Sequence, residues 1–117
     1  MKPEHPLTEL TAFDLGYICG LIVGEGSFTG DKRIAALAVK MHEDDPEPMR
    51  YLLRVLGGNM YGPYHHGDRR YYVYRLTGRP LREFLPYLDR HLPNSRKLEQ
   101  FEVWLDRYDL RDCLSAD

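Results

Sequence analysis

The 117-residue sequence contains little cysteine and no long apolar run. Its two cysteines, Cys19 and Cys113, are far apart and form no Cys-x-x-Cys pair, a usage typical of proteins from a reducing compartment. The most apolar stretch, residues 18–23, is much shorter than the roughly 18 residues needed to span a bilayer. The opening segment, MKPEHPLTEL, does not resemble a secretory signal. We therefore expect an intracellular protein, cytoplasmic or organellar, that is not secreted and has no membrane partner.

The sequence also lacks an excess of positive charge. The 16 Lys and Arg side chains are outnumbered by 18 Asp and Glu, so the net charge of −2 does not indicate a nucleic-acid-binding protein. The distribution is uneven, because residues 27–80 carry nine basic and six acidic side chains while the flanking segments are acidic. The middle segment is therefore the candidate binding region, although a mixed solvated surface would have the same composition.

The sequence does contain clear helix and strand patterns. In chain order, the predicted elements cover residues 11–26, 27–29, 34–41, 42–57, 59–66, 69–78, 79–92 and 95–110. The first and the last two are helices, the fourth is a loop followed by a helix with Asp45 as its N-cap, and the other four are strands. The first helix begins with a capping-box pattern at Thr11 and Asp14. The third helix is predicted to break or restart at Pro86.

The order α-β-β-α-β-β-α-α predicts an α+β fold in one domain. In such a fold the helices cover one face of a four-stranded sheet and leave the other face open. We expect the domain over residues 10–109, an N-terminal extension at 1–9, and a C-terminal tail at 110–117 that frays.

The stretch GLIVGEGSFTG, residues 20–30, has two interpretations. It resembles the glycine-rich loop of protein kinases, but the third glycine is displaced to Gly30, and no HRD or DFG follows. As a helix it explains more, since Gly16, Gly20 and Gly24 then lie on one face. Each glycine costs about 0.8–1 kcal/mol relative to alanine, so close approach of another helix is the expected compensation. The chain has only one such helix, which predicts a two-fold homodimer; packing of the glycines on the chain's own sheet is the alternative.

Glu25 lies at the C-terminal end of this predicted helix, where the helix dipole disfavours an anion. In a symmetric dimer, two such carboxylates would also meet near the axis and repel each other. A divalent cation would relieve both penalties. Carboxylate, backbone carbonyl and water are the ligands that Mg²⁺ prefers.

Residues 18–26, ICGLIVGEG, resemble the nine-residue LAGLIDADG motif of homing endonucleases. The later tract YRLTGRPLREFLPYLDRHLPNSRKLEQFEVWL is similar to the last strand and following helices of that family. Together the two matches cover roughly residues 10–107. The resemblance implies a four-stranded antiparallel sheet that forms a DNA-binding saddle. It also implies a homodimer of single-motif chains that makes metal-dependent double-strand breaks at a long pseudo-palindromic target. Such a chain is encoded in an intron, in an intein or as a free-standing gene, and the sequence leaves these alternatives open.

The resemblance also implies roles for individual residues. The catalytic acid falls on Glu25, and the carbonyl that reaches the metal falls on Gly24, with Mg²⁺ or Mn²⁺ as cofactor. Lys97 best matches the basic residue that serves the scissile region, although a solvated helix lysine would occupy the same position. Val23 stands where the family usually has aspartate. The implied DNA-binding residues are Ser27, Thr29, Asp31, Lys32, Arg33, Lys40, His42, His65, Arg69, Arg70, Tyr72 and Tyr74, and the implied dimer interface is Gly16, Cys19, Gly20, Val23 and Gly24.

Two other functions remain open at this level. The family tends to be basic, whereas this chain is acidic, and Ala36 and Ala38 stand where polar base-reading residues are expected. A weak or inactive member that binds DNA or RNA, such as a maturase or regulator, would fit these departures. A metal-independent protein-interaction domain is the third possibility.

Overall fold

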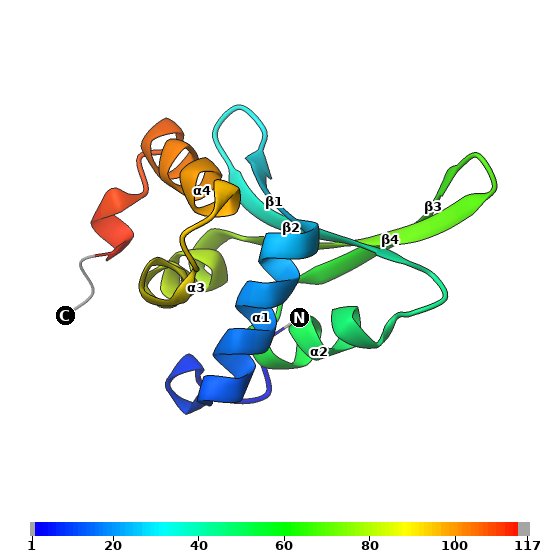
Figure 1. Cartoon of the computed structure of the whole chain (residues 1–117), viewed down its shortest axis with the longest axis horizontal. Coiled ribbons are helices and arrows are strands. Elements are labelled where there is room, and N and C mark those ends of the chain that lie inside the picture. Colours follow the sequence, from blue (N-terminus) through cyan, green and yellow to red (C-terminus); the bar gives the residue numbers. More distant parts are fainter. Residues whose placement is uncertain (1, 115–117) are drawn as a thin grey trace.

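The computed structural model describes residues 2–114 and consists of one four-stranded sheet with helices packed on one side (Figure 1). Met1 of the predicted extension and residues 115–117 of the predicted tail lie outside the described residues. The elements in chain order are η1 Leu7–Glu9, α1 Ala12–Glu25, β1 Gly26–Gly30, β2 Ala35–His42, α2 Glu47–Leu56, β3 Asn59–His66, β4 Arg69–Thr77, α3 Gly78–His91, α4 Arg96–Arg107 and η2 Arg111–Leu114. The predicted order of helices and strands is confirmed.

The sheet is fully antiparallel, with the strand order β1-β2-β4-β3. Residues paired across strands lie on the same face. One face, which we call the covered face, carries Leu37, Val39, Tyr74 and Leu76, and these pack into the core with the helices. The other, which we call the open face, carries the alternate residues, including Lys40 and its partner Val73.

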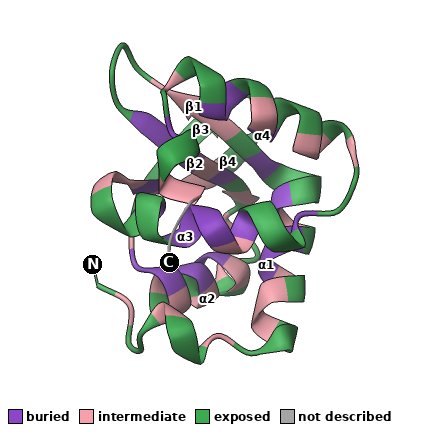
Figure 2. Ribbon diagram, turned by 90° about the vertical axis from the view of Figure 1, so that its left-hand side faces the viewer, coloured by how far each residue is buried: buried purple, intermediate pink, exposed green. Residues whose placement is uncertain are grey.

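The core lies between the covered face and the four helices. It contains Ile18, Ile22, Leu85 and Phe101, all at most 1% exposed. Figure 2 shows buried segments on the sides where helices and strands meet, with exposed residues on the outer helix surfaces. The core is therefore one-sided, and the open face makes no comparable contact with the helices.

The first helix starts and ends as its sequence predicts. Thr11 and Asp14 form a reciprocal capping box, with Asp14 N donating to Thr11 Oγ1 over 3.1 Å. At the other end α1 passes directly into β1 at Gly26. A Cβ on Gly26 would lie 2.7 Å from the Ile22 carbonyl oxygen, so this tight junction needs glycine. Glu25 is thereby held at the point where helix becomes strand.

The third helix corrects one prediction. Pro86 does not break it, because α3 runs without interruption from Gly78 to His91 with Pro86 inside. Pro86 is buried between Leu85 and Leu88, which belong to the core. Packing of this apolar face offsets the backbone hydrogen bond that a proline cannot make.

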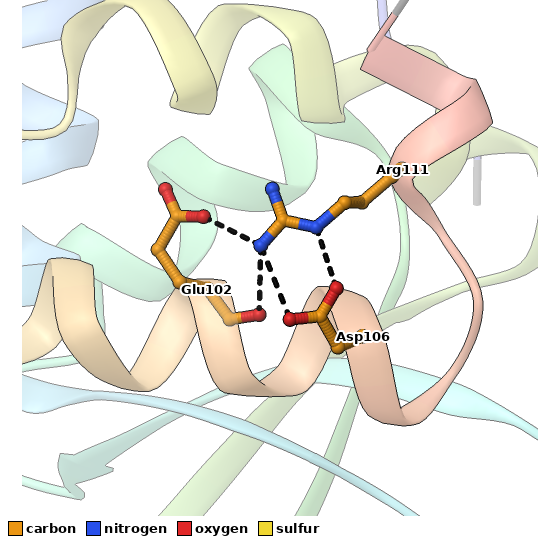
Figure 3. Close-up of polar contacts among 3 residues, drawn as sticks. All are labelled: Glu102, Asp106 and Arg111. Carbon is orange, nitrogen blue, oxygen red and sulfur yellow. Dashed lines mark hydrogen bonds and ion pairs between the residues drawn. The ribbon is translucent and has the colours of Figure 1, made fainter.

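The C-terminal tail is more ordered than predicted up to Leu114. Leu110 is buried, and η2 packs against the core through Cys113 and Leu114. Arg111 fastens this segment to α4: its guanidinium donates to Asp106 over 2.5 Å and to Glu102 over 2.8 Å (Figure 3). Across the described residues no helix is both long and apolar enough to cross a membrane.

Candidate nucleic-acid and metal site

The glycines of α1 face outward from the chain. A Cβ built on Gly16, Gly20 or Gly24 would meet no heavy atom within 4 Å. The predicted alternative, in which the glycines pack on the chain's own sheet, is therefore wrong. Phe13 and Val23 accompany the glycines at helical spacing and are 71% and 37% exposed. We call this surface the glycine face.

Cys19 does not belong to the glycine face. It is 5% exposed and packs in the core, and this burial raises the pKa of its thiol. Its predicted place in a dimer interface is therefore wrong. One residue along an α-helix is a rotation of about 100°, which carries Cys19 from the glycine face to the side that packs on the sheet.

Glu25 is exposed at the C-terminal end of the glycine face. Next to it, the half-buried Lys97 ammonium donates a 2.6 Å hydrogen bond to the Gly26 carbonyl oxygen. Lys97 comes from the first turn of α4, which Ser95 caps by accepting from Leu98 N. The structure thus brings Lys97 to the end of α1, where its positive charge compensates the negative end of the helix dipole.

The two faces of the sheet separate the predicted DNA-binding residues. Ser27 and Thr29 of β1, Lys40 and His42 of β2, and Arg69 of β4 lie on the open face. In the β1–β2 loop, Lys32 and Arg33 are exposed. Asp31 closes that loop by accepting from the Arg33 and Ile34 amides, and these hydrogen bonds lower the pKa of its carboxyl.

Four of the predicted DNA-binding residues lie on the covered face, which is a correction. Tyr74 is 0% exposed in the core, and its hydroxyl donates to the Gly57 carbonyl oxygen over 2.7 Å. Arg70, Tyr72 and His65 share that face by strand register, and Arg70 pairs with Glu43. Strand pairing places the other alternating set on the open face: Arg69, Tyr71, Val73 and Arg75 of β4 with Asn59, Tyr61, Tyr64 and His66 of β3.

The open face is basic although the chain is acidic. Its cations are Lys40, Arg69 and Arg75, and no Asp or Glu within residues 2–114 occupies an open-face strand position. The Lys40 ammonium lies 4.1 Å from the centre of the Tyr71 ring. The charged side chains at the open-face strand positions are therefore all basic although the chain has a net charge of −2, and Glu25 and Asp45 lie at the edge of that surface.

A hollow of about 430 Å³ joins Glu25 to this basic surface. We call it the Glu25 hollow; Lys40, His42, Arg69 and Glu25 contribute to its lining. The Asp44 amide donates to His42 Nδ1 over 3.2 Å, which orients the imidazole. The structure therefore brings together four residues that were predicted from segments far apart in the sequence.

Comparisons with solved structures identify the fold. The chain superposes on I-SmaMI, a LAGLIDADG homing endonuclease bound to cleaved DNA, with a TM-score of 0.71, 19% identity and 92% of this chain covered. Two lysine-to-alanine mutants of I-SmaMI match with TM-scores of 0.67 and 0.70, identities of 19% and 18%, and coverage of 84% and 92% of this chain. The chain has the LAGLIDADG homing-endonuclease fold. It spans only 37–40% of each I-SmaMI chain. No protein-family model and no curated protein matches the sequence.

The LAGLIDADG fold raises the question of whether this chain can bind a metal ion. The described part of a single chain provides some of the ligands that such an ion needs, but not a full set. Glu25 offers an exposed carboxylate, and Gly24 is exposed beside it. Within residues 2–114, however, no three His, Cys, Asp or Glu side chains are grouped to hold a metal ion. Hard oxygen ligands suit Mg²⁺ or Mn²⁺, and an exposed carboxylate beside a backbone carbonyl fits part of such a ligand set.

Sequence reasoning missed several residues on or beside the open face of this LAGLIDADG fold. His66 and Asp45 line the Glu25 hollow, and Tyr61, Tyr64 and Arg75 lie farther along the open face. The signal that could have found them is the alternation of β2, where Leu37 and Val39 are apolar and Lys40 and His42 are polar. Because paired strands share faces, that alternation fixes the face of β4 and then of β3.

Proposed function

We propose that this chain is a DNA endonuclease that acts as a homodimer, with two copies meeting along the glycine face of α1. The observation that carries the proposal is the exposed glycine face, which ends at the Glu25 carboxylate beside a hollow that Lys40 and Arg69 also line. Coverage of only 37–40% of each I-SmaMI chain supports this arrangement, since a second copy would supply further length. The binding of I-SmaMI to cleaved DNA supports DNA as the substrate.

In this proposal, double-stranded DNA lies along the open face. The longest dimension of the molecule is 45 Å, which corresponds to about 13 base pairs at 3.4 Å each. Two copies related by a two-fold axis would contact a pseudo-palindromic site of at most roughly twice that length. Lys40 and Arg69 would hold the backbone phosphate nearest Glu25 through charge-assisted hydrogen bonds.

The residues around Glu25 have distinct tasks in cleavage. Lys97, bonded to Gly26, keeps a positive charge at the end of α1 and would stabilise the negative charge that develops on the phosphate. His42 would orient the attacking water from the end of β2. Glu25 and the Gly24 carbonyl of each copy would hold Mg²⁺ or Mn²⁺, and the chemistry that such an ion supplies is activation of water and stabilisation of the leaving oxygen.

The test is cleavage of a plasmid library that carries randomised inserts, with Mg²⁺ or with EDTA. Wild type is compared with Glu25→Gln and with Glu83→Gln, a control that removes an exposed carboxylate of α3 which pairs with Arg79. We expect wild type and Glu83→Gln to cut both strands at a pseudo-palindromic site only with Mg²⁺. Glu25→Gln should be slower by roughly 100-fold or more, because several kcal/mol of transition-state stabilisation is lost.

Two other outcomes would contradict cleavage. If no variant cuts but all retain DNA selectively, the fold serves binding, as in a maturase or regulator, and Glu25 has no catalytic task. If no variant cuts or retains DNA, the interaction-domain alternative replaces both nucleic-acid functions.

A further inference from the structure

The open face contains an aromatic hollow that cleavage does not use. Tyr61, Tyr64, Tyr71, Val73 and Arg75 line a volume of about 380 Å³, which we call the tyrosine pocket. Tyr61 and Tyr64 are 45% and 44% exposed. The Tyr64 and Tyr71 rings contact each other with centroids 5.6 Å apart. An exposed aromatic cluster of this kind on a strand surface indicates a binding surface.

The positive charges around the tyrosine pocket favour DNA as its ligand. The tyrosine pocket is bordered by Arg75 on its own lining and by Lys40, whose ammonium lies over the Tyr71 ring. Within the described residues, no carboxylate occupies an open-face strand position. Apolar rings between fixed cations match a partner that presents phosphates on both sides of apolar groups, as duplex DNA does.

The shape of the β3–β4 hairpin favours binding in the major groove of DNA. In Figure 1 the β3–β4 hairpin projects away from the helices as a two-stranded ribbon. The major groove admits such a ribbon, whereas the minor groove is about half as wide. The apolar group that a base pair presents in the major groove is the 5-methyl group of thymine, and apolar side chains are its ordinary contacts. Ala38, which pairs with Arg75, is a small apolar residue on the same face.

We propose that the tyrosine pocket reads thymine by enclosing its 5-methyl group in the major groove. This inference rests on the proposed DNA-binding function and adds a specificity-determining element to it. Loss of one enclosed methyl group is expected to weaken binding about fourfold, the equivalent of about 0.8 kcal/mol for a buried carbon. The hydrogen-bonding groups of the base edge are not needed for this discrimination.

The experiment replaces thymine by uracil, which lacks only the methyl group. Duplexes recovered by selection on the wild-type protein from a random library are prepared once with thymidine and once with deoxyuridine. The dissociation constants of both forms are measured with EDTA for wild type, Tyr61→Ala and Met60→Ala. Met60 is the neighbour of Tyr61 on the covered face and is 39% exposed, so it is the matched control.

We expect wild type and Met60→Ala to bind the thymidine form at least fourfold more tightly, and Tyr61→Ala to bind both forms equally. Val73→Thr, which keeps the shape of the side chain but makes it polar, should reduce the preference in the same way and guards against misfolding of Tyr61→Ala. Equal binding of both forms by wild type would overturn the inference and leave DNA binding intact. An equal loss of preference in Met60→Ala and Tyr61→Ala would also overturn it, and absence of any DNA retention would overturn the proposed function itself.

Discussion

At the start of α1, the Asp14 carboxylate accepts hydrogen bonds from the Thr11 amide and from the Tyr51 hydroxyl. The Tyr51 hydroxyl is the largest cause that holds the pKa of Asp14 below its ordinary value of 3.8, followed by the Thr11 amide. The Tyr51 ring also packs against the Tyr17 ring, with centroids 4.6 Å apart and the rings tilted by 51°. This one carboxylate therefore joins the first turn of α1 to α2.

The lowered pKa of Asp14 gives stability a defined dependence on pH. A carboxyl whose pKa is lower in the folded state contributes stability above its unfolded pKa, and this contribution is lost as the pH falls through the folded pKa. We expect Asp14→Asn to lower the free energy of unfolding by about 1 kcal/mol at pH 7 and by much less at pH 2. Urea denaturation at both pH values measures this, with Asp112→Asn as the exposed control. An equal loss at pH 7 and pH 2 would contradict the role of the charge.

Single residues also mark the limit of what the sequence could predict. Glu25 and the three glycines follow from helical spacing, because that period is visible within one segment. The residues of β4 that face outward cannot be predicted in this way. Tyrosine stands at positions 71, 72 and 74, so both alternating sets of β4 residues combine aromatic and basic side chains. Only pairing with β2, whose apolar set is unambiguous, sends Tyr74 into the core and Tyr71 outward.

Among the elements, α1 gives a specific prediction, because its exposed glycines affect both stability and self-association. A methyl group on Gly20 meets nothing in the single chain, so Gly20→Ala gains helix propensity of about 1 kcal/mol. In a dimer whose helices touch at the glycines, the same methyl group would separate the two backbones. We expect Gly20→Ala to raise the thermal stability of the dilute protein and to weaken self-association. Analytical ultracentrifugation measures the second effect, with Val103→Ala as a control on exposed apolar surface outside the glycine face.

The strand β1 lies at the edge of the sheet, but side chains of α4 cover part of its free edge. Three side chains of α4 and its C-terminal cap donate to backbone carbonyls along β1 and its loop: Lys97 to Gly26, Trp104 to Thr29 and Tyr108 to Asp31. Polar groups on an uncovered edge invite pairing with another chain. The helix pattern of α4 was predictable from its apolar spacing, but its position along this edge was not, since these three contacts join residues more than 70 positions apart.

For the molecule as a whole, the basic open face predicts a strong salt dependence of DNA binding. Each phosphate neutralised by a side chain contributes about −0.9 to the slope of log K against log salt concentration. Lys40, Arg69 and Arg75 in each of two copies therefore predict a slope of about −5. Lys40→Gln should reduce the slope by about 2 and Arg90→Gln, on an exposed helix surface, should leave it unchanged. A slope near zero for wild type would exclude the open face as a phosphate-binding surface.

The one-sided core has a consequence for how such a protein can change over generations. Along β1, β2 and the C-terminal half of β4, alternate residues pack against the helices and the residues between them do not. Substitutions at open-face positions such as Tyr61 therefore leave the packed interior untouched, while substitutions at Tyr74 disturb it. If the chain binds DNA as proposed, single replacements on the open face can change its target preference at little cost in folding. In that case the architecture separates the residues that select a DNA site from those that keep the chain folded.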